Sequence, residues 1–429
     1  MINVKTLINK LILSKYTISV FIGWLCKIVS LLLAFLNIRL MFGIVGVEGY
    51  ALFSILSSLM AWFILINLGM PIAIQNIIAK YRVNNIDRKQ FYSNLMFLIF
   101  FILLLSIPID CVASYLVAKF LINKYLELIS FIDIFLILYM FILNGLILIL
   151  CVVLFAERRS IYPNIYPAII SIYSTIVLMI MRNFDMDISF VFVVYTLSYL
   201  FVFILSIYQS IGFIKPKYDK SITYEIFLSS RQFFIFLLLS TCVLCIDYII
   251  AAKFLNDVEI VKYNFVSKIF NVIPTLHSIL LATSFSNISE SFQSKNIKHI
   301  VSILKQNIII GFIITFIVSV VFLIFNEFII SLLSGRDDLQ ISYTTIYLAI
   351  GYMIIRNWSD AFGSALQASN NIAIINYIIP LQALINIFFQ YVLVDKFGIN
   401  GIFMALSISF LATVCIFLPI TLTKRLNSV

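Results

Sequence analysis

The chain has 429 residues, of which 63% are hydrophobic and only 11% charged, and its formal net charge is +10. Soluble proteins carry about 25% charged residues, so this composition and a mean hydropathy of +1.11 indicate a polytopic membrane protein. The apolar runs are too long for a transmembrane β-barrel, and apolar and polar residues do not alternate along them. We interpret the excess of basic residues as a sign of membrane topology rather than of nucleic-acid binding.

In chain order, the apolar segments predict about twelve transmembrane helices joined mostly by short loops. They are 16–38, 48–69, 91–117, 129–155, 162–181, 188–212, 231–252, 262–286, 305–333, 341–366, 373–394 and 400–423. The predicted fold is therefore all-α, with two pseudo-symmetric six-helix bundles around a central cavity. We expect an N-terminal bundle at 1–212, a cytoplasmic linker at 213–230 and a C-terminal bundle at 231–429.

The two halves also resemble each other faintly in sequence. Val47-Glu48 recurs as Val258-Glu259, half the chain further on, and other short matches share that offset. Six spans is an even number, so both halves begin on the same side of the membrane. This pattern predicts a parallel repeat about an axis along the membrane normal.

Basic residues predict the orientation. They fall about twice as often on one set of span ends as on the other. The richer set includes both ends of the chain, so both termini are expected in the cytoplasm. The loops Arg182–Asp187 and Gly335–Asp338 are then expected outside.

The first span carries a lysine on a polar helical stripe. At steps of three and four, small and polar side chains recur at Tyr16, Ser19, Gly23, Lys27, Ser30, Ala34 and Asn37. If the span enters the bilayer near Tyr16, Lys27 is roughly 17 Å deep. An ammonium there costs at least about 3 kcal/mol unless it faces water or a partner. The stripe predicts either a water-filled cavity or close helix packing, because small residues also favour packing.

Two later spans carry similar stripes with cations. The eighth has Asn264, Lys268, Asn271, Thr275 and Ser278, and the tenth has Thr345, Ala349, Tyr352, Arg356, Asp360, Gly363 and Gln367. Cations on three stripes favour the cavity over simple packing. The candidate substrate-binding residues are Lys27, Lys268, Arg356, Asn271 and Asn37.

Acidic residues inside spans are candidates for ion coupling. Asp247 lies deep in the seventh span and Asp360 follows Arg356 by one helical turn. A simpler alternative for Asp360 is an ion pair with Arg356 at the i, i+4 spacing. Asp247 is predicted either to pair with a cavity lysine or to bind the coupling ion.

Several motifs that enzymes need are missing from the sequence. It has no Walker nucleotide site, no metal-ligand cluster and no nucleophile–base set. We therefore predict that the chain is not an enzyme and needs no cofactor or metal. Its work would draw on an ion gradient, of H⁺ or Na⁺, or on the gradient of its own substrate.

The stretch from Gly46 to Arg82 reads GVEGYALFSILSSLMAWFILINLGMPIAIQNIIAKYR. Its G-x-E-x-Y-A-x-F start, the Leu68-Gly69 pair and the Gln-Asn pair before Arg82 closely resemble the second-span region of bacterial O-antigen flippases. These are polysaccharide-unit exporters of the multidrug/oligosaccharidyl-lipid/polysaccharide superfamily. Similar proteins often have Asp before the Leu-Gly pair, whereas this chain has Asn67.

The resemblance implies a flippase in the bacterial cytoplasmic (inner) membrane. Its substrate would be an oligosaccharide unit on undecaprenyl diphosphate, with the prenyl tail left among membrane lipids and a polysaccharide polymerase as a candidate partner. A cationic cavity suits a diphosphate. The alternatives are a cation-coupled multidrug exporter of the same superfamily, which would need a cavity acid and is disfavoured by the cavity cations, or a non-transporting scaffold for envelope polysaccharide assembly.

Overall fold

The computed structural model describes residues 15–83, 86–157, 159, 161–184, 186–212, 214–293, 295–335, 339–369 and 372–427. Every regular element in these ranges is a helix, which agrees with the all-α prediction. Residues 1–14 and 428–429 of the predicted bundles lie outside the described residues. Of the predicted outer loop Gly335–Asp338, only Gly335 lies inside them.

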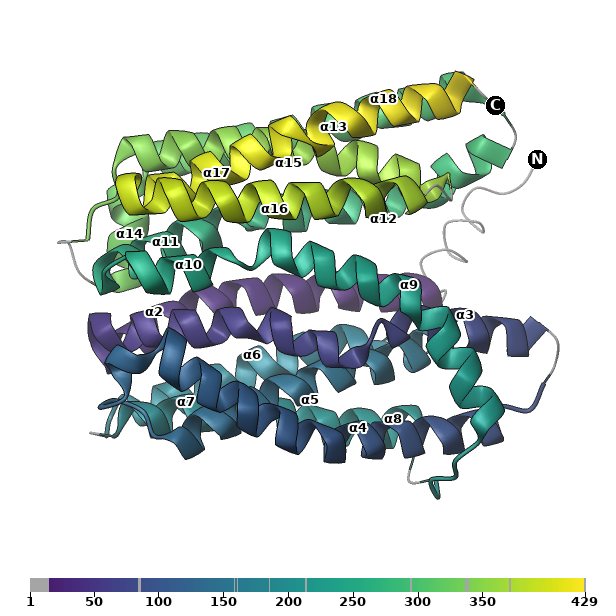
Figure 1. Ribbon diagram of the computed structural model, residues 1–429, viewed down its shortest axis with the longest axis horizontal. Helices are drawn as coiled ribbons and strands as arrows, with labels where there is room; N and C mark the ends of the chain where they lie inside the picture. Colours follow the sequence, from purple (N-terminus) through teal and green to yellow (C-terminus); the bar gives the residue numbers. More distant parts are fainter. Residues whose placement is uncertain are drawn as a thin grey trace. The chain divides into compact units, whose positions relative to one another are not determined.

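The chain divides into two compact units, unit 1 at Met1–Leu237 and unit 2 at Leu238–Val429. Unit 1 contains α2 (Lys15–Phe63), η1 (Ile64–Asn67), α3 (Met70–Val83), α4 (Lys89–Leu116), η2 (Val117–Leu121), η3 (Asn123–Tyr125), α5 (Phe131–Ala156), α6 (Ile161–Met181), α7 (Ile188–Thr196) and α8 (Ser198–Ser210). Unit 2 contains α10 (Asp247–Phe254), α11 (Asp257–Phe270), α12 (Val272–Gln293), α13 (Ile297–Ile324), α14 (Asn326–Ser334), α15 (Tyr343–Ala368), α16 (Ile372–Phe397), α17 (Ile399–Ala412) and α18 (Val414–Asn427). The helix α9 (Lys220–Leu244) contributes residues to both units (Figure 1). The bundle boundaries that the sequence predicts at residues 212 and 231 stay a prediction.

Each predicted span corresponds to helices of the structure. Among the described residues, nine segments are long and apolar enough to cross a membrane. One of the nine, Leu25–Asn67, runs from α2 into η1 and overlaps both of the first two predicted spans. The eighth span (α11 and α12) and the tenth (α15) are not among the nine, and both carry the polar residues that the sequence predicted there.

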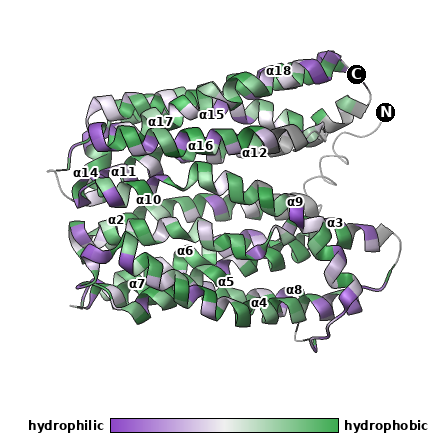
Figure 2. Ribbon diagram, viewed as in Figure 1, coloured by the Kyte–Doolittle hydropathy of each residue, from purple (hydrophilic) through white to green (hydrophobic). Residues whose placement is uncertain are grey.

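In each unit one helix lies at the centre of the packing. In unit 1, α5 contacts α2, α3, α4, α6, α7 and α8. It is apolar on all sides and mostly buried, as expected for a helix surrounded by others (Figure 2). In unit 2, α15 contacts α11, α12, α13, α16, α17 and α18. Both central helices are the fourth of the six predicted spans in their half, which supports the predicted repeat.

The stretch that carries the family resemblance forms a kink and a tight turn. Gly46 has φ +70°, a conformation that favours glycine, and it kinks α2 between the first two predicted spans. At the end of η1 the buried Asn67 side chain accepts a hydrogen bond from the Gly69 N–H at 2.9 Å. Gly69 has φ +71°, and a Cβ there would lie 2.5 Å from the backbone nitrogen of Phe234 in α9. The Leu-Gly pair is therefore a close packing point for α9.

The first half of α9 is fixed to unit 1 by polar contacts outside the apolar segments. Asp219 precedes the helix, and its backbone N–H donates to Asn94 Oδ1 of α4 at 2.7 Å. The Asp219 carboxylate accepts from the backbone N–H groups of Ile222 and Ser221. The Ile222 hydrogen bond, more than any other contact, holds the pKa of Asp219 below its usual range. This carboxylate caps the start of α9.

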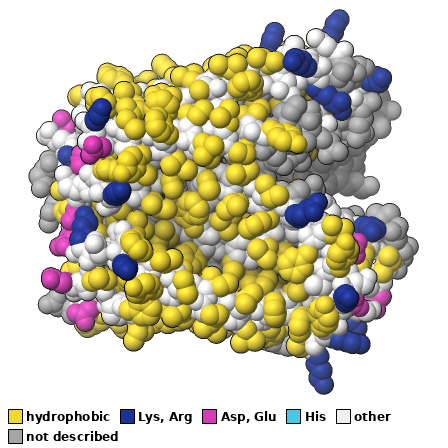
Figure 3. Space-filling model, viewed as in Figure 1, with side chains coloured by type: hydrophobic (Ala, Val, Ile, Leu, Met, Phe, Trp, Pro, Cys, Tyr) yellow, Lys and Arg dark blue, Asp and Glu magenta, His cyan; other side chains and the backbone are white. Residues whose placement is uncertain are grey.

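On the face drawn in Figure 3, charged side chains lie toward the ends of the helices and hydrophobic side chains cover their middles. Many large apolar side chains are exposed within spans, among them Leu104 (69%) of α4 and Phe316 (70%) of α13. A soluble protein does not expose so much apolar surface. The exposed apolar surface is the one expected of helices surrounded by lipid.

Candidate functional site

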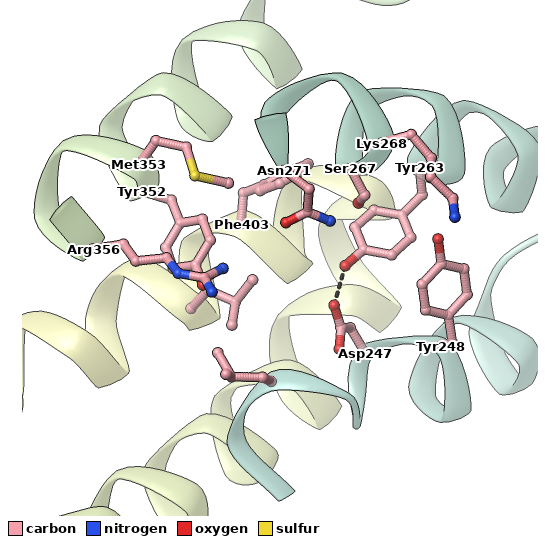
Figure 4. A pocket seen from close by; sticks show the side chains of 12 residues that line it. Asp247, Tyr248, Tyr263, Ser267, Lys268, Asn271, Tyr352, Met353, Arg356 and Phe403 are labelled. Atoms are coloured by element: carbon pink, nitrogen blue, oxygen red, sulfur yellow. Dashed lines mark hydrogen bonds between the residues drawn. The ribbon is translucent and has the colours of Figure 1, made fainter. Parts of the chain in front are cut away.

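Unit 2 contains a pocket of about 160 Å³ between helices that are distant in sequence. Its walls come from the end of α9, from α10, α11 and the residue after it, and from α15 and α17. The lining residues are Leu244, Asp247, Tyr248, Tyr263, Ser267, Lys268, Asn271, Tyr352, Met353, Arg356, Phe403 and Leu406 (Figure 4). Four of the residues predicted from the sequence therefore meet in one pocket: Asp247, Lys268, Asn271 and Arg356.

Lys268 and Asn271 enter the pocket because α11 ends there. The helix begins with a capping box, in which Asn256 and Glu259 bond to each other's backbone N–H. It ends at Phe270, with Asn271 as its C-cap. Lys268 is in the last turn, where the helix dipole favours a cation, and its side chain is exposed. Lys268 and Asn271 therefore line the pocket from the junction of α11 and α12, inside a predicted span.

Arg356 comes from the middle of α15, the central helix of unit 2. Its Nη1 donates to the hydroxyl of Tyr352, one turn earlier, at 3.4 Å. Its Nε lies 3.7 Å from Oδ2 of Asp360, one turn later. A guanidinium has five N–H donors, and these two long contacts engage few of them. Arg356 can therefore offer donors to an anion in the pocket, while Asp360 lies next to it without lining the pocket.

The acidic side of the pocket is formed by a helix break in the seventh span. The helix α9 ends at Leu244, Cys245 and Ile246 lie between the two helices, and Asp247 begins α10. A carboxylate is favoured at a helix N-terminus. Asp247 is 7% exposed, and its Oδ2 accepts a hydrogen bond from the Tyr263 hydroxyl (Figure 4). Among the described residues none donates to its Oδ1.

Aromatic hydroxyls complete the pocket. The Tyr248 hydroxyl accepts a hydrogen bond from Asn264 Nδ2 at 2.7 Å, and the Tyr248 ring packs edge-on against Tyr263. In Figure 4, Tyr263 lies between Arg356 and Lys268, which come from different helices and lie on opposite sides of the view. The arrangement combines two cations, one carboxylate and several hydroxyl and amide groups. Such a site can bind an anion and hydrogen-bond to a polar ligand.

The remaining predicted residues lie in unit 1. Lys27 is exposed on α2. The position of Gly23, one turn earlier on the same stripe, is closed by Asn164, which would lie 3.0 Å from an added Cβ. Asn37 is buried, and its Oδ1 accepts a hydrogen bond from Thr175 Oγ1 of α6 at 2.7 Å. The stripe of the first span therefore contributes to packing against α6 along part of its length, while Lys27 stays exposed.

Two kinds of residue were missed by the sequence reasoning. Tyr248 and Tyr263 line the pocket, but a tyrosine in an apolar run has no distinctive sequence signal. Asp110 of α4 is fully buried, and it is not among the acidic candidates that the sequence predicts. Its signal was present in the sequence, because Asp110 interrupts the apolar run of the third span two residues after Pro108.

Comparisons with known proteins agree with the resemblance. The family model named MatE matches residues 233–392. A protein of Yersinia pseudotuberculosis named for O-antigen export is 27% identical over an alignment of 425 residues, which covers 95% of this chain and 95% of its own length. A protein of Salmonella typhi named as an O-antigen transporter is 28% identical over 93% of this chain and 94% of its own length. The resemblance to bacterial O-antigen exporters is confirmed.

Solved structures show the fold. The inward-facing multidrug resistance transporter of the MATE family has a TM-score of 0.75 at 12% identity and covers 93% of this chain and 95% of its own. The inward closed lipid II flippase MurJ has a TM-score of 0.70 at 15% identity and covers 95% of this chain and 89% of its own. Both share the fold of this chain over most of its length, so the predicted fold class is confirmed. Because these relatives are named for O-antigen export or transport, the prediction that the chain is not an enzyme is confirmed as well.

Proposed function

We propose that the chain is a flippase that moves undecaprenyl-diphosphate-linked oligosaccharide units from the cytoplasmic to the periplasmic leaflet of the bacterial inner membrane. The observation that carries the proposal is the cationic pocket of unit 2, in a protein whose relatives are named for O-antigen export. Lys268 and Arg356 would otherwise be costly charges inside a membrane protein. A diphosphate would compensate both of them.

The size of the pocket defines which part of the substrate it could hold. Its volume of about 160 Å³ is smaller than the roughly 300–1,000 Å³ of pockets for drug-sized ligands. A diphosphate is expected to fit, whereas a whole oligosaccharide is not. Arg356 would bind phosphate oxygens through its planar donors and Lys268 as a point charge. Asn271 and the tyrosines would hydrogen-bond to the first sugar, and the prenyl tail would remain in lipid.

Unit 1 is proposed to contribute Lys27 to the same substrate in other steps of transport, and Asn37 on the same stripe would join it only after leaving its hydrogen bond to Thr175. The two six-helix halves would rock between inward-open and outward-open states, as alternating access requires. Asp247 and Asp360 are proposed to bind the coupling ion, H⁺ or Na⁺. The free oxygen of Asp247 and the long contact of Asp360 to Arg356 leave both carboxylates able to accept a proton. A polysaccharide polymerase remains a candidate partner.

A second candidate is the export of cationic drugs. The likeness to the multidrug transporter and the tyrosine-lined acid at Asp247 favour it. The two cations in the same pocket argue against it, because like charges repel. A scaffold without transport would not need the charges of the pocket at all.

The decisive experiment measures lipid-linked oligosaccharide in a strain from which the gene has been deleted. We expect untranslocated units to accumulate on the cytoplasmic side and surface polysaccharide to return when the chain is supplied. Arg356→Ala should fail to restore it at matched protein levels, whereas Lys253→Ala, an exposed cation outside the pocket, should succeed. Normal surface polysaccharide in the deletion strain would refute the proposal.

A further inference from the structure

Unit 1 contains a carboxylic acid that the proposed transport mechanism does not use. Asp110 lies within the apolar segment Lys89–Leu121, and it is 0% exposed. Ser106 and Ser114, one turn before and one turn after it, are also 0% exposed. Steps of four place the three side chains on one face of α4. The face is therefore a buried polar strip in an otherwise apolar helix.

The surroundings of Asp110 contain hydroxyl groups rather than charges. The helix α4 packs against α5, whose Tyr139 reaches this region and donates from its hydroxyl to the Leu103 carbonyl at 3.4 Å. Ser106 donates to the same carbonyl at 2.8 Å. Among the described residues, no ion pair involves Asp110. Tyr139 is the ionisable group that faces it from the packed helix.

Both oxygens of the Asp110 carboxyl lack a hydrogen-bond partner among the described residues, and so does the hydroxyl of Ser114. An ionised carboxylate that is buried without a counter-charge or a donor is so unfavourable that the group takes up a proton instead. A protonated carboxyl has one O–H donor, and the unpartnered Ser114 hydroxyl can accept it after a small side-chain rotation. The same hydroxyl can instead donate one hydrogen bond to the anion, but a single neutral donor without a counter-charge does not offset the burial of a full charge, so the neutral acid fits this environment better than the anion.

We propose that Asp110 is a proton-binding site of unit 1, which holds a proton while α4 and α5 are packed as described and exchanges it when water reaches their interface. Binding forms an O–H bond between a proton from water and the carboxylate, and release returns that proton to water and leaves the anion. A metal ion is a poorer fit, because hard cations need about six oxygen ligands and this face offers few. Among the described residues, no group of three acidic, histidine or cysteine side chains gathers around a possible metal.

The sequence also provides a place for the interface to open. Pro108, two residues before Asp110, lies inside α4 and cannot donate the backbone hydrogen bond of an ordinary helical residue. Prolines are common points of helix bending. A bend there would move the face that carries Asp110 relative to α5. The use of this motion in transport rests on the proposed function, whereas the proton on Asp110 does not.

The first test is infrared spectroscopy of the full-length protein in lipid nanodiscs. At neutral pH we expect the carbonyl band of a protonated carboxylic acid, and we expect Asp110→Asn to lose a component of it. Asp133→Asn is the control, because Asp133 is a partly exposed acid at the start of α5 that is hydrogen-bonded to Ser130. An unchanged band in Asp110→Asn would overturn the proposal.

The second test is substrate transport in proteoliposomes with and without an imposed pH gradient. Asn imitates the neutral acid, so Asp110→Asn should fold normally but lose the acceleration that the gradient gives the wild type. A full gradient response in Asp110→Asn would overturn the exchange of the proton during transport. No transport by the wild type in either condition would refute the flippase assignment, and the infrared result would still decide whether Asp110 is protonated.

Discussion

Single basic residues inside the helices differ in how far the protein itself neutralises them. Among the described residues, neither Lys27 nor Lys268 forms an ion pair, whereas Arg356 has Asp360 at 3.7 Å. A cation in a membrane segment without a protein anion needs water or an anionic ligand. The two lysines are therefore at least as strong candidates for phosphate contact as the arginine.

Lys27 gives a test of charge alone. Loss of one charge-assisted hydrogen bond to an anion costs about 1.5–3 kcal/mol, which corresponds to roughly a 10- to 150-fold weaker binding. We expect Lys27→Ala to reduce surface-polysaccharide assembly in the complemented deletion strain at matched expression. Lys27→Arg should retain much of it, because the exposed side chain has room for the larger guanidinium.

Arg39→Ala is a matched control for Lys27, because Arg39 is another exposed cation on α2. It should leave export unchanged. Full export by Lys27→Ala would remove Lys27 from the mechanism, and equal losses in both Ala variants would point to a general effect of charge on α2.

The position of Asp247 in the pocket predicts how the affinity for an anion changes with pH. Its carboxylate shares the pocket with Lys268 and Arg356, so a negative charge there opposes a bound anion. As pH falls, protonation of Asp247 removes this charge, and binding of pyrophosphate to the purified protein should tighten. Asp247→Asn imitates the protonated form and keeps a similar shape, so it should lack the part of the pH dependence that comes from Asp247. The protonation of pyrophosphate itself affects the wild type and the variant alike. Calorimetric titration at several pH values measures both, and a variant with the wild-type pH slope would contradict the prediction.

At the scale of elements, the spans were predictable because long apolar runs determine them, but their internal breaks were not. The sequence predicted a loop near residues 39–47, whereas α2 continues there and bends at Gly46. It gave no sign of the breaks at Cys245–Ile246 and Asn271, which place Asp247 and Asn271 in the pocket. Such breaks depend on tertiary contacts, here the Asp247–Tyr263 hydrogen bond among them. The polar stripes could be found by periodicity, but the neighbour each one faces could not.

Gly69 tests the packing of α9 on the turn after η1. Any side chain at Gly69 must adopt φ +71° and would meet the backbone of α9 at 2.5 Å, where no flexible group can move aside. We expect Gly69→Ala to destabilise the protein by about 2 kcal/mol or more. Thermal unfolding of the detergent-solubilised protein, followed by tryptophan fluorescence, should show a lower midpoint.

The control for this element is Gly43→Ala. Gly43 is an exposed residue of α2 without a positive φ, and nothing lies within 4 Å of an added Cβ. Alanine also favours helix more than glycine does. Its unfolding midpoint should equal or exceed that of the wild type. A Gly69→Ala variant as stable as Gly43→Ala would show that α9 does not depend on this contact.

For the whole molecule, composition and span count predicted the fold class, because a chain in lipid can satisfy its backbone only through helices or a closed barrel, and the long apolar runs without period-two alternation exclude the barrel. The repeat was faint in sequence but agrees with the central positions of α5 and α15, each the fourth span of its half.

Only part of the pocket was predictable from the sequence. Cations on polar stripes identified Lys268 and Arg356, whereas Tyr248, Tyr263 and the burial of Asp110 depend on which helices pack together.

Orientation is the remaining property of the whole chain that the sequence predicts. Lys215, Lys217 and Lys220 surround Tyr218, whereas Arg182 is the one basic residue close to Asn183. Cytoplasmic segments are the ones enriched in basic residues, so Tyr218 is expected inside and Asn183 outside. Both side chains are exposed and lie outside the helices, so a cysteine at either position can be labelled.

The labelling uses a variant in which the six native cysteines are replaced, because all of the native cysteines are free thiols. In cells with a permeabilised outer membrane, an impermeant maleimide should label Asn183→Cys. Tyr218→Cys should react only after the inner membrane is broken. The reverse pattern would place both termini outside. The basic segments would then face the periplasm, and the predicted orientation would be wrong. Labelling of both positions in intact membranes would instead contradict the number of spans, because 183 and 218 are expected to be separated by one crossing, formed by α7 and α8.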